Sequence, residues 1–250
     1  KNPQLLRLNF GVFALHSTLT TAFIAIPIIQ MQTLHLSHQQ MGLFYLAMLS
    51  ISLIVMVPCI IYAEKYHQLK RVFCSAIALL LISQIACLWL TPNNTHLFIF
   101  LTLFFIGFNI LEATLPSLIS KIAPSAAKGT AMGVYNTMQS LGLFLGGAIG
   151  GWIYEQSKNG AQSIFIMGCI TLTIWLALAI SMRTPQAVKN IVLHLADDWQ
   201  KEIEITQQQL LHISGVQEAM ILIEERAVYL KVLQQGVDLA AIESLLNAPD

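Results

Sequence analysis

The sequence predicts an α-helical membrane protein of six transmembrane helices, followed by a small α+β domain. Of the 250 residues, 56% are hydrophobic and only 10% are charged, and the mean hydropathy is +0.66. A soluble domain carries about 25% charged residues. The charges are also unevenly divided, because residues 1–185 hold nine Lys and Arg and three Asp and Glu, whereas residues 186–250 hold four and ten. This shift predicts a membrane domain, 1–185, and a soluble domain, 186–250.

Six apolar runs in the first part reach the roughly 17–25 residues that a transmembrane helix needs. These runs are Leu8–Ile29, Leu43–Tyr62, Val72–Leu90, Leu97–Ile119, Met132–Tyr154 and Ile164–Met182. The segments between them alternate in charge: the Ala63–Arg71 and Ser120–Lys128 loops are basic, whereas the opposite side has only Lys158. The positive-inside rule therefore predicts that both ends of this chain are cytoplasmic.

Residues 186–250 follow a different pattern of short strands and amphipathic helices. The predicted elements, in order, are the strand Asn190–Leu195, the helix Trp199–Ile213, the strands Gln217–Ile223 and Ala227–Leu233, and the helix Leu239–Leu246. Gly215 stands in the usual stop position after the first helix, and Asp238 caps the second. This order predicts a ferredoxin-like α+β unit without its last strand.

The four cysteines indicate neither disulfides nor metal binding. Cys59, Cys74, Cys87 and Cys169 lie in apolar runs, and none has a partner at CxxC spacing. They are predicted to be small packing residues. We predict no cofactor and no nucleic-acid partner. A membrane enzyme or sensor is disfavoured, because no cluster of His, Asp and Cys lies at a common depth in the spans.

One carboxyl group, that of Glu112, lies inside the fourth apolar run. A charged side chain at membrane depth costs roughly 2.5–3.5 kcal/mol on insertion scales, so a helix that serves only as an anchor has no reason to carry it. We therefore expect Glu112 to face a cavity or a partner helix and to exchange protons. The alternative is a structural acid bonded to Asn136 or to a neighbouring backbone group.

Four more polar side chains in the spans each have two interpretations. Asn109, one turn before Glu112, either lines the cavity or only satisfies the carboxyl group. His16 either relays protons or is a hydrogen-bonded packing residue. Asn136 and Gln139, one turn apart, either line the cavity or join helices. With Glu112, these residues form the predicted substrate or proton pathway.

Glycines at regular spacing occupy the second half of the fifth run. Gly142, Gly146 and Gly150 share one helix face at i, i+4 and i+8, and Gly147 and Gly151 lie beside them. Small residues at this spacing let two helices approach closely. We predict a tight helix contact here, of the kind that a rocking or sliding helix needs.

Several stretches resemble the C-terminal half of a major facilitator superfamily transporter. Gly133–Gly147 is similar to the eleventh helix of the drug:proton antiporter branch, and Phe108–Ser117 is similar to the tenth. A degenerate version of that family's basic loop between helices 8 and 9 is formed by Lys65, Lys70 and Arg71. The chain begins with Lys1 rather than Met, so we expect a fragment that lacks its N-terminal part.

The tail resembles heavy-metal-associated domains in Ile213–Ala219 and Val228–Val232, as in transporters of this superfamily that end in such a domain. It lacks their CxxC motif, and no Cys lies beyond Cys169. Thiolate binding of soft metals in the tail is therefore excluded. No metal site is predicted, although a weak site remains open at His194, Asp197 and Asp198.

The resemblance implies half of a twelve-helix fold that works by alternating access around a midplane site. It implies a proton-coupled transporter in a bacterial inner (plasma) membrane that exports small hydrophobic or amphipathic compounds. Its implied partners are the substrate, protons, the lipid bilayer and an N-terminal six-helix half. An uptake transporter for sugars, osmolytes or organic acids is the alternative, and a membrane-anchored sensor or enzyme is the alternative of another class.

The acidic tail is expected to dock on the basic loops or to pair with a second copy through a sheet edge. A short linker keeps it close to the membrane part. Each exposed ion pair contributes about 0–1 kcal/mol, so docking would be weak and salt-sensitive.

Deleting residues 187–250 from the full-length transporter should leave a folded carrier with an altered transport rate or pH response. Cross-links between the Ala63–Arg71 loop and the tail should fade as salt rises. Unchanged transport, with no cross-link at low salt, would rule docking out.

Overall fold

The chain forms two compact units in the computed structural model, which describes residues 2–89, 93–124, 127–183, 188–195, 199, 202–233 and 236–247. One unit, residues 1–123 and 129–184, is a bundle of six helices. The other unit, residues 124–128 and 185–250, is built on a small antiparallel sheet. The predicted fold class, a helical membrane protein with a small α+β domain, is confirmed.

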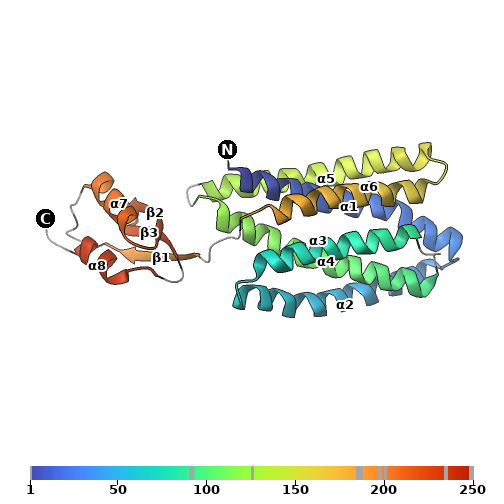
Figure 1. Cartoon of the computed structure of the whole chain (residues 1–250), viewed down its shortest axis with the longest axis horizontal. Helices are drawn as coiled ribbons and strands as arrows, with labels where there is room; N and C mark the ends of the chain where they lie inside the picture. The colour runs from blue at the N-terminus through green and yellow to red at the C-terminus, as the bar shows by residue number, and fades with distance from the viewer. Residues whose placement is uncertain are drawn as a thin grey trace. The chain divides into compact units, whose positions relative to one another are not determined.

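The six helices of the bundle run side by side (Figure 1). Their bounds are Pro3–Ile28 for α1, His38–Lys65 for α2, Leu69–Trp89 for α3, Asn94–Ile122 for α4, Lys128–Gln156 for α5 and Gly160–Ile180 for α6. One π-helical turn, Ile29–Thr33, continues α1. It follows Pro27, whose missing N–H and bulky ring disturb the regular hydrogen-bond ladder.

Each predicted apolar run forms a helix, and the helices extend beyond the runs into polar sequence. Polar caps explain where three of them begin, because a side-chain oxygen binds a free N–H of the first turn. The cap pairs are Asn2 with Gln4, Ser37 with Gln40 and Asn93 with His96. The predicted basic loop at Ala63–Arg71 is also shorter, because α2 ends at Lys65 and only Tyr66–Gln68 lie between α2 and α3.

Within the described part of the chain, five helices are long and apolar enough to cross a membrane, namely α1 with its π turn, α2, α3, α4 and α6. The predicted sixth span, α5, has 29 residues and is therefore long enough, but it does not reach the same apolar content. Glycine and amide side chains account for the difference. This composition suits a helix that contacts other helices rather than lipid.

The glycine face of α5 lies against α1. A Cβ atom added to these glycines would lie 2.6 Å from the carbonyl oxygen of Phe13 at Gly142, 2.6 Å from Cα of Ser17 at Gly146 and 2.7 Å from Cγ2 of Thr21 at Gly150. Real Cβ atoms do not approach other heavy atoms this closely. The neighbouring glycines Gly147 and Gly151 have no atom within 4 Å of such a Cβ. Of the α5 glycines, only Gly142, Gly146 and Gly150 are thus in close contact with another helix of this bundle.

The second unit contains a three-stranded antiparallel sheet in the order β1-β3-β2, formed by Val188–His194, Val216–Leu222 and Ala227–Leu233 for β1, β2 and β3. Helix α7, Ile203–His212, lies between β1 and β2 in the chain, and α8, Leu239–Asn247, follows β3. This strand order is that of a ferredoxin-like unit without its fourth strand, among the residues described.

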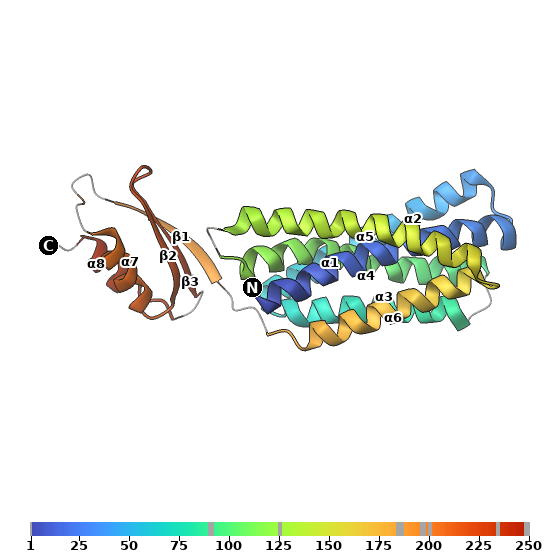
Figure 2. The same ribbon diagram turned by 90° about the horizontal axis from the view of Figure 1, so that it is seen from above.

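Both helices of the second unit pack on one face of the sheet (Figure 2). Their buried contacts are Leu210 of α7 and Ile242 and Leu246 of α8, set against Val228 and Leu230 of the central strand. Two predicted local signals are confirmed here. Gly215 has φ +87°, and a carboxylate oxygen of Asp238 accepts the N–H of Ala241 at 3.0 Å.

The contact between α5 and α1 can be tested with a matched pair of glycines. Gly146→Ala should lower thermal stability by overpacking, typically by about 1–3 kcal/mol, because the Cα of Ser17 belongs to the backbone and cannot rotate away. Gly147→Ala should be neutral or stabilising, since Ala favours a helix over Gly by up to about 1 kcal/mol. The measurement is thermal unfolding of the detergent-solubilised protein. Equal midpoints for the two variants would contradict the close contact.

Candidate functional site

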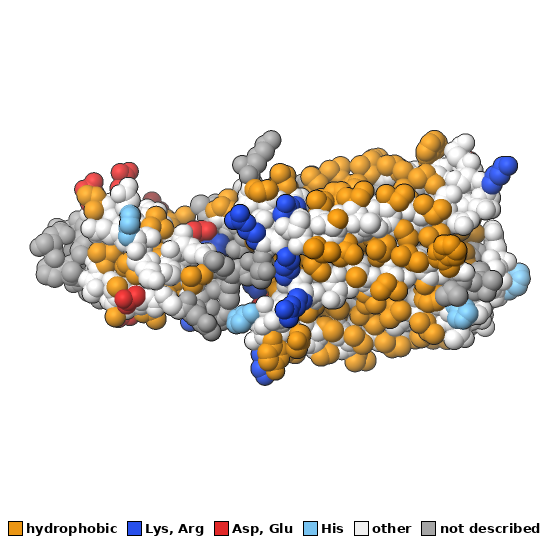
Figure 3. Space-filling view, in the orientation of Figure 1, with side chains coloured by type: hydrophobic (Ala, Val, Ile, Leu, Met, Phe, Trp, Pro, Cys, Tyr) orange, Lys and Arg blue, Asp and Glu red, His pale blue; other side chains and the backbone are white. Residues whose placement is uncertain are grey.

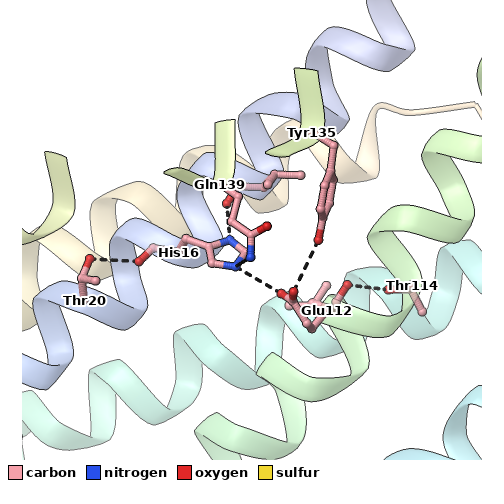
Figure 4. Close-up of polar contacts among 8 residues, drawn as sticks. His16, Thr20, Glu112, Thr114, Tyr135 and Gln139 are labelled. Carbon is pink, nitrogen blue, oxygen red and sulfur yellow. Dashed lines mark hydrogen bonds and ion pairs between the residues drawn. The ribbon is translucent and has the colours of Figure 1, made fainter. Parts of the chain in front are cut away.

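An acid and an imidazole from two helices meet inside the bundle. Nε2 of His16 in α1 lies 3.3 Å from Oε2 of Glu112 in α4. The amide nitrogen of Gln139 in α5 lies 2.9 Å from the same Nε2, and the hydroxyl of Tyr135, also in α5, donates to Oε1 of Glu112 at 3.4 Å. Figure 4 shows the four side chains pointing toward one another from the three helices. We call them the α1–α4–α5 cluster.

The hydrogen bonds of His16 fix one of its two ring protons. Nδ1 lies 2.9 Å from the carbonyl oxygen of Val12, one turn earlier in α1. A carbonyl oxygen can only accept, so Nδ1 carries a proton. Any further proton must then sit on Nε2, the atom that faces Glu112. A proton at this 3.3 Å contact would be held either by the imidazolium or by the neutral carboxylic acid.

Two neutral side chains can take the place of that proton. When it is absent, Nε2 has a lone pair that accepts an N–H from Gln139, and the carboxylate accepts the O–H of Tyr135. When the proton is on Nε2, the Gln139 amide can turn its oxygen toward the ring, because amide nitrogen and oxygen are nearly equal in shape. Both protonation states of the pair thus have hydrogen-bond partners.

The members of the cluster differ in their exposure. The side chain of His16 is 3% exposed and that of Glu112 is 37% exposed, while Tyr135 is buried. Glu112 is therefore the most exposed of these three groups, although its Oε2 atom, which faces His16, is itself buried. A proton that reaches His16 from outside the bundle would pass through Glu112.

The close contact of α5 with α1 positions the cluster. Gly142 follows Gln139 by three residues and lies on the same side of α5. A Cβ atom added to Gly142 would lie 3.1 Å from Cβ of His16. A larger residue at this position would push α5 away from α1 and draw Gln139 out of reach of the imidazole.

Two of the residues predicted for the pathway lie elsewhere. Asn109 does not satisfy Glu112, because its amide donates to the hydroxyl of Ser52 in α2 at 2.8 Å. Asn136 is exposed on α5, and its neighbour Tyr135 contacts the carboxyl group instead. The sequence analysis missed Tyr135 and Ser52. Tyr135 precedes Gln139 by four residues, a spacing that places both on one helix face.

Basic side chains gather at one end of the helical unit, beside a broad apolar flank (Figure 3). There Lys121 of α4 pairs with Glu64 of α2, at 2.7 and 2.8 Å. Arg7 and Lys70 donate to the last carbonyl groups of α6, those of Ile180 to Met182. These cations thus satisfy carbonyl groups that a helix end leaves without partners.

Metal binding has no support in the described part of the chain, where no three His, Cys, Asp or Glu residues are grouped to hold an ion. The weak site considered in the tail involves Asp197 and Asp198, which lie outside the described residues. The four cysteines are free thiols.

Membrane-spanning helices that bring ionisable and amide side chains together inside a bundle are typical of membrane transport proteins. The Major Facilitator Superfamily matches residues 8–216. Because this match covers most of the chain, the chain belongs to that superfamily of transporters and is not an enzyme.

Curated relatives agree with this membership. The chain is 37% identical over 246 residues to the inner membrane transport protein YajR of Escherichia coli K12. This match covers 98% of this chain and 53% of that protein. It is 30% identical over 155 residues to an uncharacterized transporter of Buchnera aphidicola, covering 62% and 39%. It is 26% identical over 149 residues to the multidrug resistance protein MdtH of Escherichia coli, covering 57% and 36%. The chain thus spans about half the length of YajR and less than half the length of the other two relatives.

The bond between Asn109 and Ser52 can be tested by stability. Ser52→Ala should leave the half-buried amide of Asn109 without its acceptor and destabilise the protein by about 1–3 kcal/mol. Ser50→Ala is the matched control, because Ser50 lies on the same helix and its hydroxyl bonds to the carbonyl of Leu46 within that helix. Thermal unfolding in detergent measures both. A Ser52→Ala midpoint no lower than that of Ser50→Ala would show that the bond contributes nothing to stability.

Proposed function

We propose that this chain is the C-terminal half of a proton-coupled secondary transporter that exports small hydrophobic or amphipathic compounds. Superfamily membership supports transport, and the names of two relatives, an inner membrane transport protein and a multidrug resistance protein, support the membrane and the substrate class. The fraction of YajR that the chain covers, 53%, supports an assignment as one half. Residues 1–185 would be that six-helix half, and 186–250 a ferredoxin-like domain.

The observation that carries proton coupling is the contact between His16 and Glu112. Nδ1 of His16 is already protonated, so the pair as a whole gains or loses one proton at the Nε2–Oε2 contact. A carboxyl group at membrane depth costs least when it is neutral or paired with a cation. Proton gain and loss therefore change the charge of the pair, and this change can bias the helices that carry it.

Alternating access gives this change of charge a mechanical consequence. The cluster joins α1, α4 and α5, and the glycine face lets α5 lie close to α1. With the proton bound, the imidazole, carboxyl and amide groups draw the three helices together. With the proton lost, the carboxylate is free to attract an amphipathic cation or a new proton from the side where the cavity is open. Binding of substrate and proton to the same carboxyl group would then be mutually exclusive, as an antiporter requires.

The exposed part of Glu112 and the remaining surface of α5 suit a cavity shared with an N-terminal half. α5 is less apolar than the other helices, and its Phe144 and Trp152 are 70% and 64% exposed. We propose that α5 contributes to the surface between the halves. Asn136, exposed one residue after Tyr135, would line the same cavity.

Glu112→Gln in the full-length transporter should fold, since glutamine keeps the size of the side chain and can still bond with Tyr135, but should lose proton-driven transport. The reason is that an amide cannot release a proton. The measurement is substrate-driven proton movement and pH-driven substrate flux in liposomes. Glu155→Gln is the control, because Glu155 is an exposed acid at the end of α5.

His16→Gln should change the pH dependence of transport without abolishing substrate binding, because Glu112 keeps its carboxyl group but loses its contact with the imidazole nitrogen. Normal substrate-driven proton movement in Glu112→Gln would contradict the proposed proton coupling through Glu112. An unaltered pH profile in His16→Gln would remove His16 from it and leave Glu112 alone.

A further inference from the structure

A groove opens between α2 and α3 near the basic end of the helical unit, with α4 forming part of its wall. Its volume is about 420 Å³. Most of its lining is apolar and includes Val72 and Leu79 of α3 and Ile106 and Ile110 of α4, while Arg71 lies at the end nearest the α2–α3 turn. The helices that form it are three of the five that are apolar enough to cross a membrane.

A second cavity, of about 500 Å³, adjoins the groove at its basic end. The two share Gln68 and Arg71, and the second is also lined by His67 and Lys70. The apolar groove therefore ends at a cavity that is lined by cationic and polar side chains. Arg71 stands between the two.

Two other cations near this end have protein partners. Lys121 pairs with Glu64, and Lys70 donates to two carbonyl groups of the α6 end. Arg71 is exposed, and no ion pair joins it to an acid in the described residues. A guanidinium group is suited to binding phosphate with two parallel hydrogen bonds.

The dimensions of the groove fit part of an acyl chain. From Arg71 to Leu79 is eight residues of α3, which corresponds to about 12 Å along the helix axis. The hydrocarbon core of a bilayer contains no water, so an apolar groove between membrane-spanning helices is suited to a lipid chain. Basic pockets between transmembrane helices are, in turn, suited to anionic lipid head groups.

We propose that this groove is a binding site for an anionic phospholipid. One acyl chain lies between α2 and α3, and the phosphate contacts Arg71, with Lys70 and His67 adding positive charge around the head group. The site is separate from the α1–α4–α5 cluster, because none of the residues that line it belongs to that cluster. Lipid bound here would hold α2 and α3 at a fixed separation on α4.

The test compares two lipids with identical acyl chains on the full-length transporter. Native mass spectrometry of the purified protein measures the affinity for the first bound phosphatidylglycerol and for the first bound phosphatidylcholine. The wild type should prefer phosphatidylglycerol. Arg71→Ala should weaken phosphatidylglycerol binding about fivefold, the effect of one cation near an anionic lipid, and should reduce the preference. Lys65→Ala is the matched control, because it removes one positive charge at the same end from a residue that does not line the groove.

A second variant tests the acyl-chain half of the site without changing its charge. Ser75 is exposed and lines the groove, so Ser75→Phe should fill it and weaken binding of both lipids. Ile82→Phe, on an exposed position of the same helix outside the groove, should bind both lipids as the wild type does. Wild-type lipid affinities in both Arg71→Ala and Ser75→Phe would overturn the proposal. An equal loss in Lys65→Ala and Arg71→Ala would also overturn it, because the attraction would then be a general property of the basic end.

Discussion

The contact between His16 and Glu112 is the interaction on which the polar side chains of the bundle depend. An imidazole that is 3% exposed and a carboxyl group at membrane depth are both costly to bury without partners. The structure meets this cost by placing the two groups 3.3 Å apart and by three further bonds. The carbonyl of Val12 holds Nδ1, Gln139 faces Nε2, and Tyr135 bonds to the carboxyl group. If α1, α4 or α5 moved away from the other two helices, a polar side chain of the cluster would lose a partner. The positions of these three helices are therefore linked through one cluster.

Close helix approach is the condition that makes this cluster possible. Side chains of ordinary size hold helix axes apart by 8–10 Å, and glycine removes that spacer on α5. The same device recurs on α4, where a Cβ atom added to Gly107 would lie 2.8 Å from the carbonyl oxygen of Ala76 in α3. Glycine weakens a helix by up to about 1 kcal/mol relative to alanine. In this bundle that loss is offset by contact between helices, so the glycines stabilise the packed state although they disfavour the isolated helix.

Helix α4 packs against α1 and also against α2 and α3. One side of it presents Glu112 to α1 and α5, and another presents Asn109 to Ser52 of α2. Its other contacts include α3, and α2 and α3 are separated enough beside α4 to leave the groove that ends at Arg71. A proton at Glu112 and a lipid between α2 and α3 would therefore act on the same helix from different sides.

The sequence by itself determined the elements, because hydrophobic length and periodicity are local properties. It predicted all six helices of the bundle and the five elements of the tail, and its errors lay at the boundaries, where caps such as Ser37 and Asn93 extend helices into polar sequence. It also singled out Glu112, His16 and Gln139, because polar groups in apolar runs are rare. Only the tertiary structure decided which of them meet. Spacing along one helix left open whether Asn109 satisfies Glu112 or lines the cavity, and the structure places its amide against Ser52 of α2. Contacts between residues 16, 112, 135 and 139 depend on how close α5 comes to α1, and that distance is set by packing across helices rather than by any pattern along one of them.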